Sequence, residues 1–177
     1  KEWYATIGKN GWRLEEFQHY YGNATFDDDV SSDAARFLLR MYLEKLDPAY
    51  KYPLDKAINF IIGSQYAIGG WPQRYPLMYE FSHHGNPDYS SFFTFNDDVV
   101  WENINFLIQC YVTLGEKKFL DPIRRGMNFY LITQQAAPQA GWGQQHTPDL
   151  KPAGARTYEP KGLLPRYTAS HIMLLIK

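Results

Sequence analysis

The sequence has very little cysteine, no long apolar run and almost no net charge. Cys110 is the only cysteine among 177 residues, so neither a disulfide framework nor a cysteine-based metal site can form within the chain. Without a run of about 18 apolar residues or a charged-then-apolar leader, we expect no membrane span and no intact signal peptide. The 18 basic and 19 acidic residues leave a net charge of -1. Such a balance gives no long-range field for nucleic acid or an anionic membrane, and we expect neither as a partner.

Several common enzyme motifs are also missing. The sequence contains no HExxH, no P-loop, no GxGxxG and no recognisable Ser or Cys nucleophile motif, which removes the usual support for zinc hydrolases, nucleotide enzymes and dehydrogenases. Aromatic residues, by contrast, are abundant, with 14 Tyr, 11 Phe and 5 Trp. Those that lie in loops either line a site for flat ligands such as sugar rings or fill the gaps between helices, and both interpretations stay open.

An internal repeat organises the chain. Residues 25–30 (Thr-Phe-Asp-Asp-Asp-Val) match residues 94–99 (Thr-Phe-Asn-Asp-Asp-Val), an offset of 69 positions. After a slip of two positions, residues 70–73 (Gly-Trp-Pro-Gln) match residues 141–144 (Gly-Trp-Gly-Gln). The repeat units run from about 25 to 93 and from about 94 to 164, within a length that fits a single domain, 1–177.

Each unit predicts two helices followed by a long loop, because apolar residues recur at steps of three and four. The first helices carry Val30, Ala34, Phe37, Leu38 and Met41 in one unit, and Val99, Asn103, Phe106, Leu107 and Cys110 in the next. An offset this long exceeds the common solenoid periods, so we expect an all-α fold, an (α/α) toroid of helical hairpins, with an open helical array as the alternative.

Two loops and the end of the chain complete this fold prediction. Residues 68–93 and 136–165 are too long for passive connectors, and we expect these loops to form the active face. The chain ends in an apolar run without a stop signal, typical of a helix cut partway. We therefore expect the ring to be incomplete in this chain and truncated at its C-terminus.

Acidic residues cluster at both predicted helix starts. Thr25 or Asp27, and Thr94 or Asn96, are suitable N-caps, and acidic residues in a first turn complement the helix dipole. Three adjacent carboxylates repel one another, however, and a calcium ion, which takes 6 to 8 oxygen ligands, would relieve that repulsion. Capping and calcium binding are both left open. The diphosphate-binding pattern Asp-Asp-x-x-Asp is not matched, since the next acidic residue, Asp33, comes one position too late.

The second long loop contains a candidate anion-binding arginine. Arg156 lies between small residues and an aromatic, and its planar fork suits a carboxylate ligand. An ion pair with Glu159 explains the same residue equally well. His146 in this loop is either a hydrogen-bonded loop residue or a ligand contact.

Together these segments resemble polysaccharide lyase family 10, the pectate lyases with an (α/α)3 toroid. The resemblance rests on the paired Thr-Phe-(Asp/Asn)-Asp starts, on residues 69–77 and 152–160, and on the turn of Gln145 and His146. It runs from about residue 11 to residue 160. This chain departs from the family at residues 161–166, where the family has a turn rich in Ser and Gly, and it lacks the family's C-terminal third with further substrate-binding arginines.

The resemblance implies a substrate, a reaction and a cofactor. The substrate would be polygalacturonate, an acidic polysaccharide, cleaved by β-elimination to 4,5-unsaturated products. Asp97, Asp27 and Asp28 would hold Ca²⁺, and Arg156 would take the C5 proton as the base. We further expect a monomer that is secreted, periplasmic or at the cell surface.

Residue type and loop position suggest further substrate contacts. We expect Gln73, Arg74, Tyr75, His146 and Tyr158 to orient sugar carboxylates and rings, and Trp71 and Trp142 to be stacking platforms. Two other functions stay open. One is a glycoside hydrolase on the same toroid, with Asp27 and Asp97 as its acid and base; the other is a non-catalytic sugar-binding module derived from a lyase.

Overall fold

The computed structural model describes residues 24–77, 89–156 and 159–176 and is all-α, as predicted. Its α-helices are α3 (Val30–Lys45), α4 (Pro48–Gly63), α5 (Val99–Leu114), α6 (Leu120–Thr133) and α7 (Pro165–Leu175), and its 3-10 helices are η1 (Asp27–Asp29), η2 (Asn96–Asp98) and η3 (Lys117–Phe119). None of the helices in the described residues is long and apolar enough to cross a membrane.

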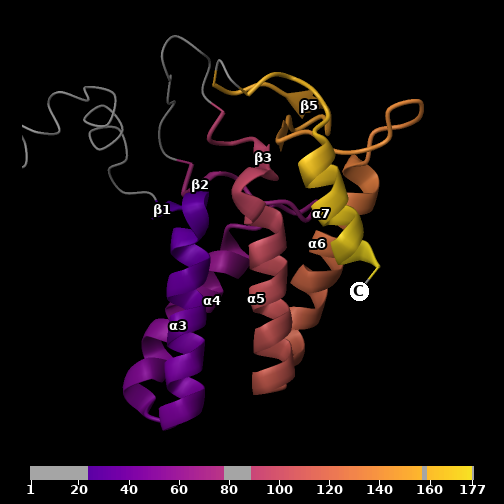
Figure 1. The fold of residues 1–177 in the computed structure, drawn as a ribbon. Coiled ribbons are helices and arrows are strands. Elements are labelled where there is room, and N and C mark those ends of the chain that lie inside the picture. Colours follow the sequence, from indigo (N-terminus) through magenta and orange to yellow (C-terminus); the bar gives the residue numbers. More distant parts are fainter. Residues whose placement is uncertain (1–23, 78–88, 157–158, 177) are drawn as a thin grey trace, which may run out of the picture.

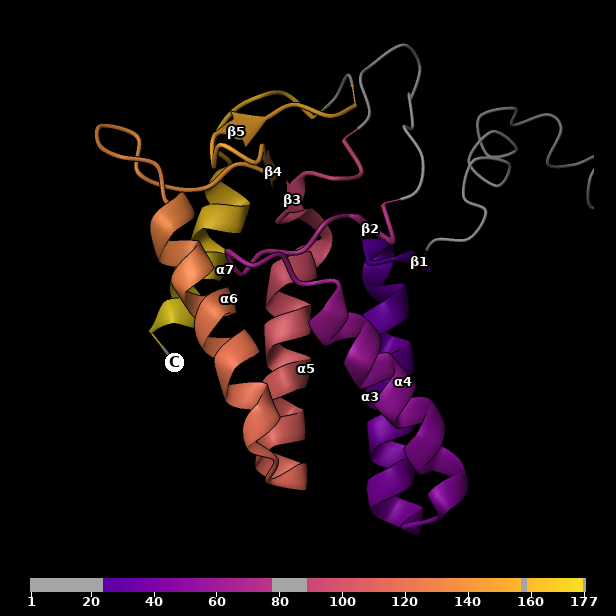
Figure 2. The same cartoon turned by 180° about the vertical axis from the view of Figure 1, so that it is seen from behind.

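The helices form two antiparallel hairpins and one further helix (Figure 1). Helix α3 pairs with α4, α5 pairs with α6 through η3, and α3 also packs along α5. Arg36 of α3 and Glu102 of α5 form an ion pair between the hairpins. Helix α7 lies against the second hairpin, and the long loops gather at one end of the molecule, above the starts of α3, α5 and α7 (Figures 1 and 2).

Short strands tie these loops to the helix starts. Strand β1 (Ala24–Thr25) pairs with β2 (Arg74–Tyr75) in front of α3, and β3 (Phe93–Thr94) pairs with β4 (Gln145–His146) in front of α5, all antiparallel. Strand β5 (Pro152–Ala153) extends the second sheet. Each loop therefore returns to the helix start of its own repeat unit.

Local sequence signals fix several helix ends. Asp47 accepts a hydrogen bond of 2.8 Å from the Ala49 N–H at the start of α4, and Pro48 follows as the first helical residue, a combination that satisfies one of the free N–H groups and presets φ. Helix α5 ends at Gly115, whose φ of 71° lies in the left-handed region that favours glycine.

The core centres on α5. The face predicted for this helix is confirmed, because Val99, Asn103, Phe106, Leu107 and Cys110 are all buried. The face predicted for α3 is wrong in part: Leu38 packs against the core, but Val30, Ala34 and Phe37 are exposed. The buried residues of α3 are Ser32, Ala35 and Leu39, whereas Val30 and Phe37 are each 60% exposed. The reason is position: α5 packs against α3, α6, η1, η2 and η3, while α3 packs against α4, α5, η1 and β1, so less of the surface of α3 is covered.

Candidate functional site

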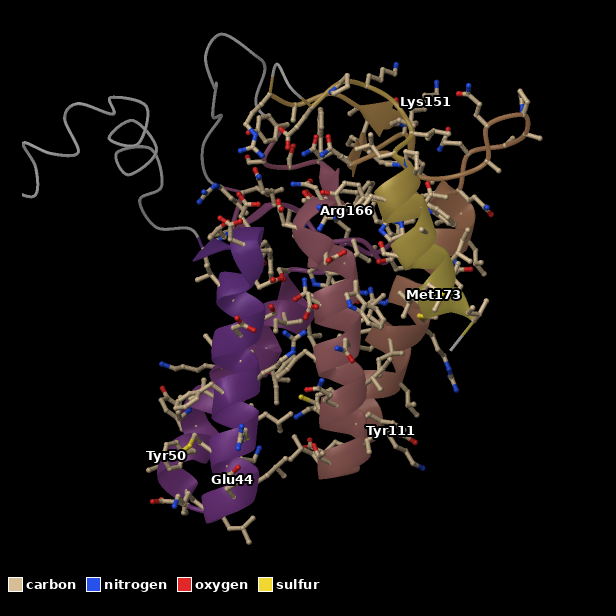
Figure 3. The ribbon with its side chains drawn as sticks, viewed as in Figure 1. Glu44, Tyr50, Tyr111, Lys151, Arg166 and Met173 are labelled. Carbon is tan, nitrogen blue, oxygen red and sulfur yellow. The ribbon has the colours of Figure 1, made fainter. Side chains whose placement is uncertain are left out.

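The two acidic helix starts lie against each other at the loop end of the hairpins. Helices η1 and η2 are in contact, and the carboxyl group of Asp97 lies close enough to that of Asp27 to raise its pKa. Asp28 lies beside them and is exposed. Side chains from several loops converge on this end of the molecule (Figure 3). The structure thus brings together the three aspartates that the sequence singled out.

The backbone at both helix starts is strained. Asp28 and Asp29 have φ values of 52° and 58°, and Asp97 and Asp98 both have 51°. The left-handed region costs a non-glycine residue about 1–2 kcal/mol, although Asp tolerates it better than most. Strain of this kind persists where the surrounding structure enforces it, often at functional sites.

Helix capping does not explain these aspartates. Asp29 and Asp98 occupy the N-cap positions of α3 and α5, yet neither side chain makes a capping hydrogen bond. In the first turn of each start, a cap would be the ordinary reason for an acidic residue. Of the capping residues that the sequence offered, Thr25 accepts a hydrogen bond of 3.0 Å at its Oγ1 from Asp27 N–H at the start of η1. Capping by Thr25 is therefore supported at the first start, whereas the aspartates at the two N-caps do not cap.

Crowding of carboxylates changes the electrostatics of the site. Burial raises the pKa of Asp27 to about 7, helped by the nearby carboxyl groups of Asp97 and Asp28, and opposed by the charge of Arg156. Burial also raises the pKa values of Asp29 and Asp98. One oxygen of Asp27, Oδ1, is buried and has no hydrogen-bond partner among the described residues. A buried carboxylate oxygen without a partner lowers the stability of the fold unless a ligand binds to it.

The fit of calcium to this site depends on the ligand as well as the protein. In the described parts of the chain, no group of three or more His, Cys, Asp or Glu side chains could hold a metal ion alone. The facing carboxyl groups of Asp27 and Asp97 and the orphaned Oδ1 match the oxygen ligands that Ca²⁺ prefers. They fit a calcium ion whose remaining ligands come from water and from a bound anionic sugar.

Arg156 is held by Glu159. Its Nε and one Nη donate to the two carboxylate oxygens of Glu159, each over 2.7 Å, and its backbone N–H donates over 3.1 Å. Glu159 is 4% exposed. The ion pair that the sequence offered as one explanation of Arg156 is therefore present, and it stabilises the charged guanidinium. Arg156 still faces the site, because its charge acts on Asp27.

The segment 73–75 lies against the first helix start. The Gln73 carbonyl accepts a hydrogen bond of 2.9 Å from Phe26 N–H, and its side chain reaches Asp27 Oδ2 at 3.5 Å. Arg74 is 8% exposed. The Tyr75 ring packs edge-on against Phe60, with 5.9 Å between ring centroids. Gln73 thus borders the acidic site, whereas substrate contacts of Arg74 and Tyr75 stay predictions.

Both tryptophans predicted to contact the sugar are structural instead. Trp71 and Trp142 are 0% and 1% exposed, and their Nε1–H groups donate to the carbonyls of Ile61 and Tyr130 over 2.8 and 2.9 Å. Neither indole offers a face to a sugar, so their prediction as stacking platforms is wrong. Although both residues lie in loops, their rings are buried in the core, because burying a large apolar ring stabilises the fold.

His146 is also misassigned by the sequence. It is 0% exposed, its Nε2 accepts from Gly143 N–H over 3.0 Å, and its Nδ1 lies 3.2 Å from the Leu150 carbonyl. Burial lowers its pKa to about 4. A buried neutral histidine that holds its own loop does not orient a substrate. Tyr158, the remaining predicted contact, lies outside the described residues.

Sequence reasoning missed three charged residues near the site. Asp29 and Asp98 belong to the acidic clusters but were not selected, and only their left-handed backbone and raised pKa values distinguish them. Arg166 lies close enough for its charge to lower the pKa of Asp98. No motif in the sequence marks it.

Fold and site together define a protein of helical hairpins with an acidic ligand site at its loop end. The family model of pectic acid lyases matches residues 4–177. The chain belongs to the pectic acid lyase family. A search of curated proteins finds no match.

Solved structures agree with this assignment. One is a family 10 polysaccharide lyase from Cellvibrio cellulosa, with a TM-score of 0.73 and 25% identity, covering 85% of this chain and 48% of that chain. Another is an aspartate-to-alanine mutant of a family 10 polysaccharide lyase from the same organism in complex with trigalacturonic acid, with a TM-score of 0.73, 24% identity, and coverage of 85% and 49%. The resemblance to family 10 and the toroid-like all-α fold are confirmed. The chain spans about half the length of these structures.

Proposed function

We propose that this chain is the core of a pectate lyase that cleaves α-1,4-polygalacturonate by calcium-assisted β-elimination and releases 4,5-unsaturated oligogalacturonates. One observation carries the proposal: the carboxyl groups of Asp27 and Asp97, from two separate helix starts, face each other beside Arg156. Membership of the pectic acid lyase family supports it. The trigalacturonic acid complex of the Cellvibrio enzyme points to the same class of substrate.

Asp27 and Asp97 would hold the calcium ion, with the exposed Asp28 beside them. When bound, calcium would supply positive charge next to the sugar carboxylate, where negative charge builds up as the C5 proton leaves. The protein holds the two carboxylates together at the expense of folding stability. Two features lower that stability: Asp27 Oδ1 is buried without a partner in the described residues, and the backbone of Asp28 and Asp97 is strained.

Arg156 would accept the C5 proton. The ordinary pKa of an arginine lies far above neutrality, so its neutral form is rare near neutral pH. The two hydrogen bonds to Glu159 favour the charged form further. We therefore expect elimination to be fast only at alkaline pH, in a substrate complex that shifts Arg156 away from Glu159.

A glycoside hydrolase has less support. The raised pKa of Asp27 would suit a general acid. The family to which the chain belongs and the similar solved structures are lyases, however, not hydrolases.

The test is to mix the 177-residue chain with polygalacturonate at alkaline pH, with calcium or with a chelator, and to follow the ultraviolet absorbance of unsaturated ends. We expect a rise that requires calcium, and its loss in Arg156→Ala. Arg124→Ala, at an exposed position on α6, should leave the rate unchanged.

Other outcomes separate the alternatives. New reducing ends without ultraviolet absorbance would identify a hydrolase. Calcium-dependent binding of the polymer without any product would identify a binding module. Either result overturns the proposed reaction.

A further inference from the structure

Arg166 stands at the start of α7. The helix start is fixed by buried partners. The Leu164 N–H donates to the Trp142 carbonyl over 3.1 Å, and Trp142 N–H donates to Thr168 Oγ1 over 3.2 Å. One turn further along, the His171 ring packs on Phe95, with 4.9 Å between centroids. Phe95 directly precedes η2, so the first turn of α7 is anchored next to the acidic helix starts.

The side chain of Arg166 is exposed. It lies between the first turn of α7 and the start of α5 (Figure 3). Its charge reaches Asp98 and opposes the rise in the pKa of that carboxyl group. Arg156, by contrast, has two of its guanidinium nitrogens engaged by Glu159.

The ion pairs within 4.0 Å in the described parts of the chain do not include Arg166. Its N–H donors therefore remain accessible to a ligand at this end of the molecule. A guanidinium binds a carboxylate through two parallel hydrogen bonds, a geometry that a methyl ester cannot reproduce.

We propose that Arg166 binds a carboxylate of the galacturonate chain at a subsite next to the Asp27 and Asp97 pair. The inference rests on the proposed function, because it assumes that an acidic polysaccharide lies across the loop end. Each sugar of such a chain carries one carboxylate, so one can meet Asp27, Asp97 and Arg156 while a neighbouring one meets Arg166. Methyl esterification of that second sugar would remove both its charge and its bidentate acceptor.

The experiment compares wild type, Arg166→Ala and Arg124→Ala by calorimetric binding of trigalacturonate and of its methyl ester, with calcium present. We expect Arg166→Ala to weaken binding of trigalacturonate by about tenfold, the scale of a hydrogen bond to a charged group, and to leave methyl-ester binding unchanged. Arg166→Lys should recover part of the loss, since it restores the charge without the fork. Arg124→Ala should match wild type on both ligands.

An unchanged ratio of the two affinities in Arg166→Ala would overturn the inference. An arginine that only neutralises Asp98 would give that result, because both ligands would weaken in the same proportion. If wild type cleaves polygalacturonate while Arg166→Ala keeps its preference for the acid form, only the role of Arg166 fails. If wild type neither binds nor cleaves, the proposed function fails with it.

Discussion

The two acidic helix starts have the same backbone conformation but differ in the side chain at one position. Each has two consecutive aspartates in the left-handed region. Asn96 occupies the place in the second start that Asp27 occupies in the first. Asn96 is 1% exposed, donates from Nδ2 to Asp97, and accepts from Gln145 Nε2 over 2.9 Å. Asp27 has a buried oxygen without a partner in the described residues.

This comparison separates scaffold from site. The features that repeat are structural: Phe26 N–H donates to the Gln73 carbonyl over 2.9 Å, and Phe95 N–H donates to the Gln144 carbonyl over 2.8 Å. The feature that differs between the units is the carboxylate of Asp27, which has an oxygen without a hydrogen-bond partner in the described residues. We infer that duplication supplied a pair of equivalent helix starts and that the ligand site arose where one of them stayed unsatisfied.

The largest expected effect comes from making the first start like the second. Asp27→Asn keeps the shape of the side chain and removes a proposed calcium ligand, so we expect kcat/KM on polygalacturonate to fall about 100- to 1,000-fold, the scale for losing one group that stabilises the transition state. Initial rates from ultraviolet absorbance at saturating calcium measure it. Asp33→Asn, an exposed carboxylate in the first turn of α3, is the matched control and should change the rate little.

The same variant should be more stable than wild type at alkaline pH. The folded-state pKa of Asp27 is raised to about 7 from 3.8, so Asp27 binds a proton more tightly in the folded state, and stability is lost as pH rises through about 7. Removing the carboxyl should raise the free energy of unfolding at pH 9 by about 1–3 kcal/mol. A loss of both activity and stability would mean that Asp27 is a structural residue.

The reverse change should damage the fold. Asn96→Asp places a second acid beside Asp97 at a fully buried position and removes the Nδ2 donor. We expect a loss of about 3 kcal/mol in the free energy of unfolding at pH 8, the scale for an uncompensated buried charge. Urea denaturation measures it. Tolerance of Asn96→Asp would show that the two starts are interchangeable and would break the comparison.

The sequence predicted the parts of this molecule that depend on periodicity and repetition. The buried face of α5 follows from apolar residues at steps of three and four, and the repeat marks the two acidic helix starts, whereas the grouping of Asp27 with Asp97 came from the family resemblance. Part of the buried face of α3 was missed because its exposure depends on how many neighbours pack around it. That information lies in the tertiary arrangement, not in the local pattern.

The site was predicted less completely than the fold. Trp71, Trp142 and His146 sit in loops rich in Gly and Pro, which favoured a surface position, but these loops fold back and bury the rings. Arg156 was left between two explanations, and only the coordinates show its contact with Glu159. Arg166 has no counterpart in the motifs, so its proximity to Asp98 could come only from the packing of α7.

A smaller effect should be a difference between the two repeat units in how their stability depends on pH. Buried histidines lie in the second unit and in α7: His146 has a pKa of about 4 and His171 a pKa of about 3. Each binds a proton less tightly in the folded state than in the unfolded one, so stability is lost as pH falls below about 6.5, by about 2 kcal/mol for each histidine at pH 5. The position equivalent to His146 in the first unit is Tyr75, which does not take up a proton in this range.

His171→Phe tests this directly. Its ring packs against Phe95, Tyr130 and Trp142, and neither of its nitrogens has a hydrogen-bond partner in the described residues, so phenylalanine suits the site. We expect the loss of stability between pH 8 and pH 5 to shrink by about 2 kcal/mol relative to wild type. Parallel denaturant titrations at both pH values measure it. An unchanged pH dependence would mean that His171 is protonated or hydrated in the folded state.

The smallest expected effect is the loss of stability on removing one buried tryptophan hydrogen bond, and it should be the same in both repeat units. Trp71→Phe and Trp142→Phe each remove one buried indole hydrogen bond, to the carbonyl of Ile61 or of Tyr130. Each change should lower the free energy of unfolding by about 1–2 kcal/mol and leave KM for polygalacturonate within about twofold of wild type. Because the two bonds are equivalent in the repeat, the two losses should be similar. A large rise in KM with little loss of stability would restore the indoles as sugar-binding platforms, and unequal losses would show that the two hairpins do not use their tryptophans in the same way.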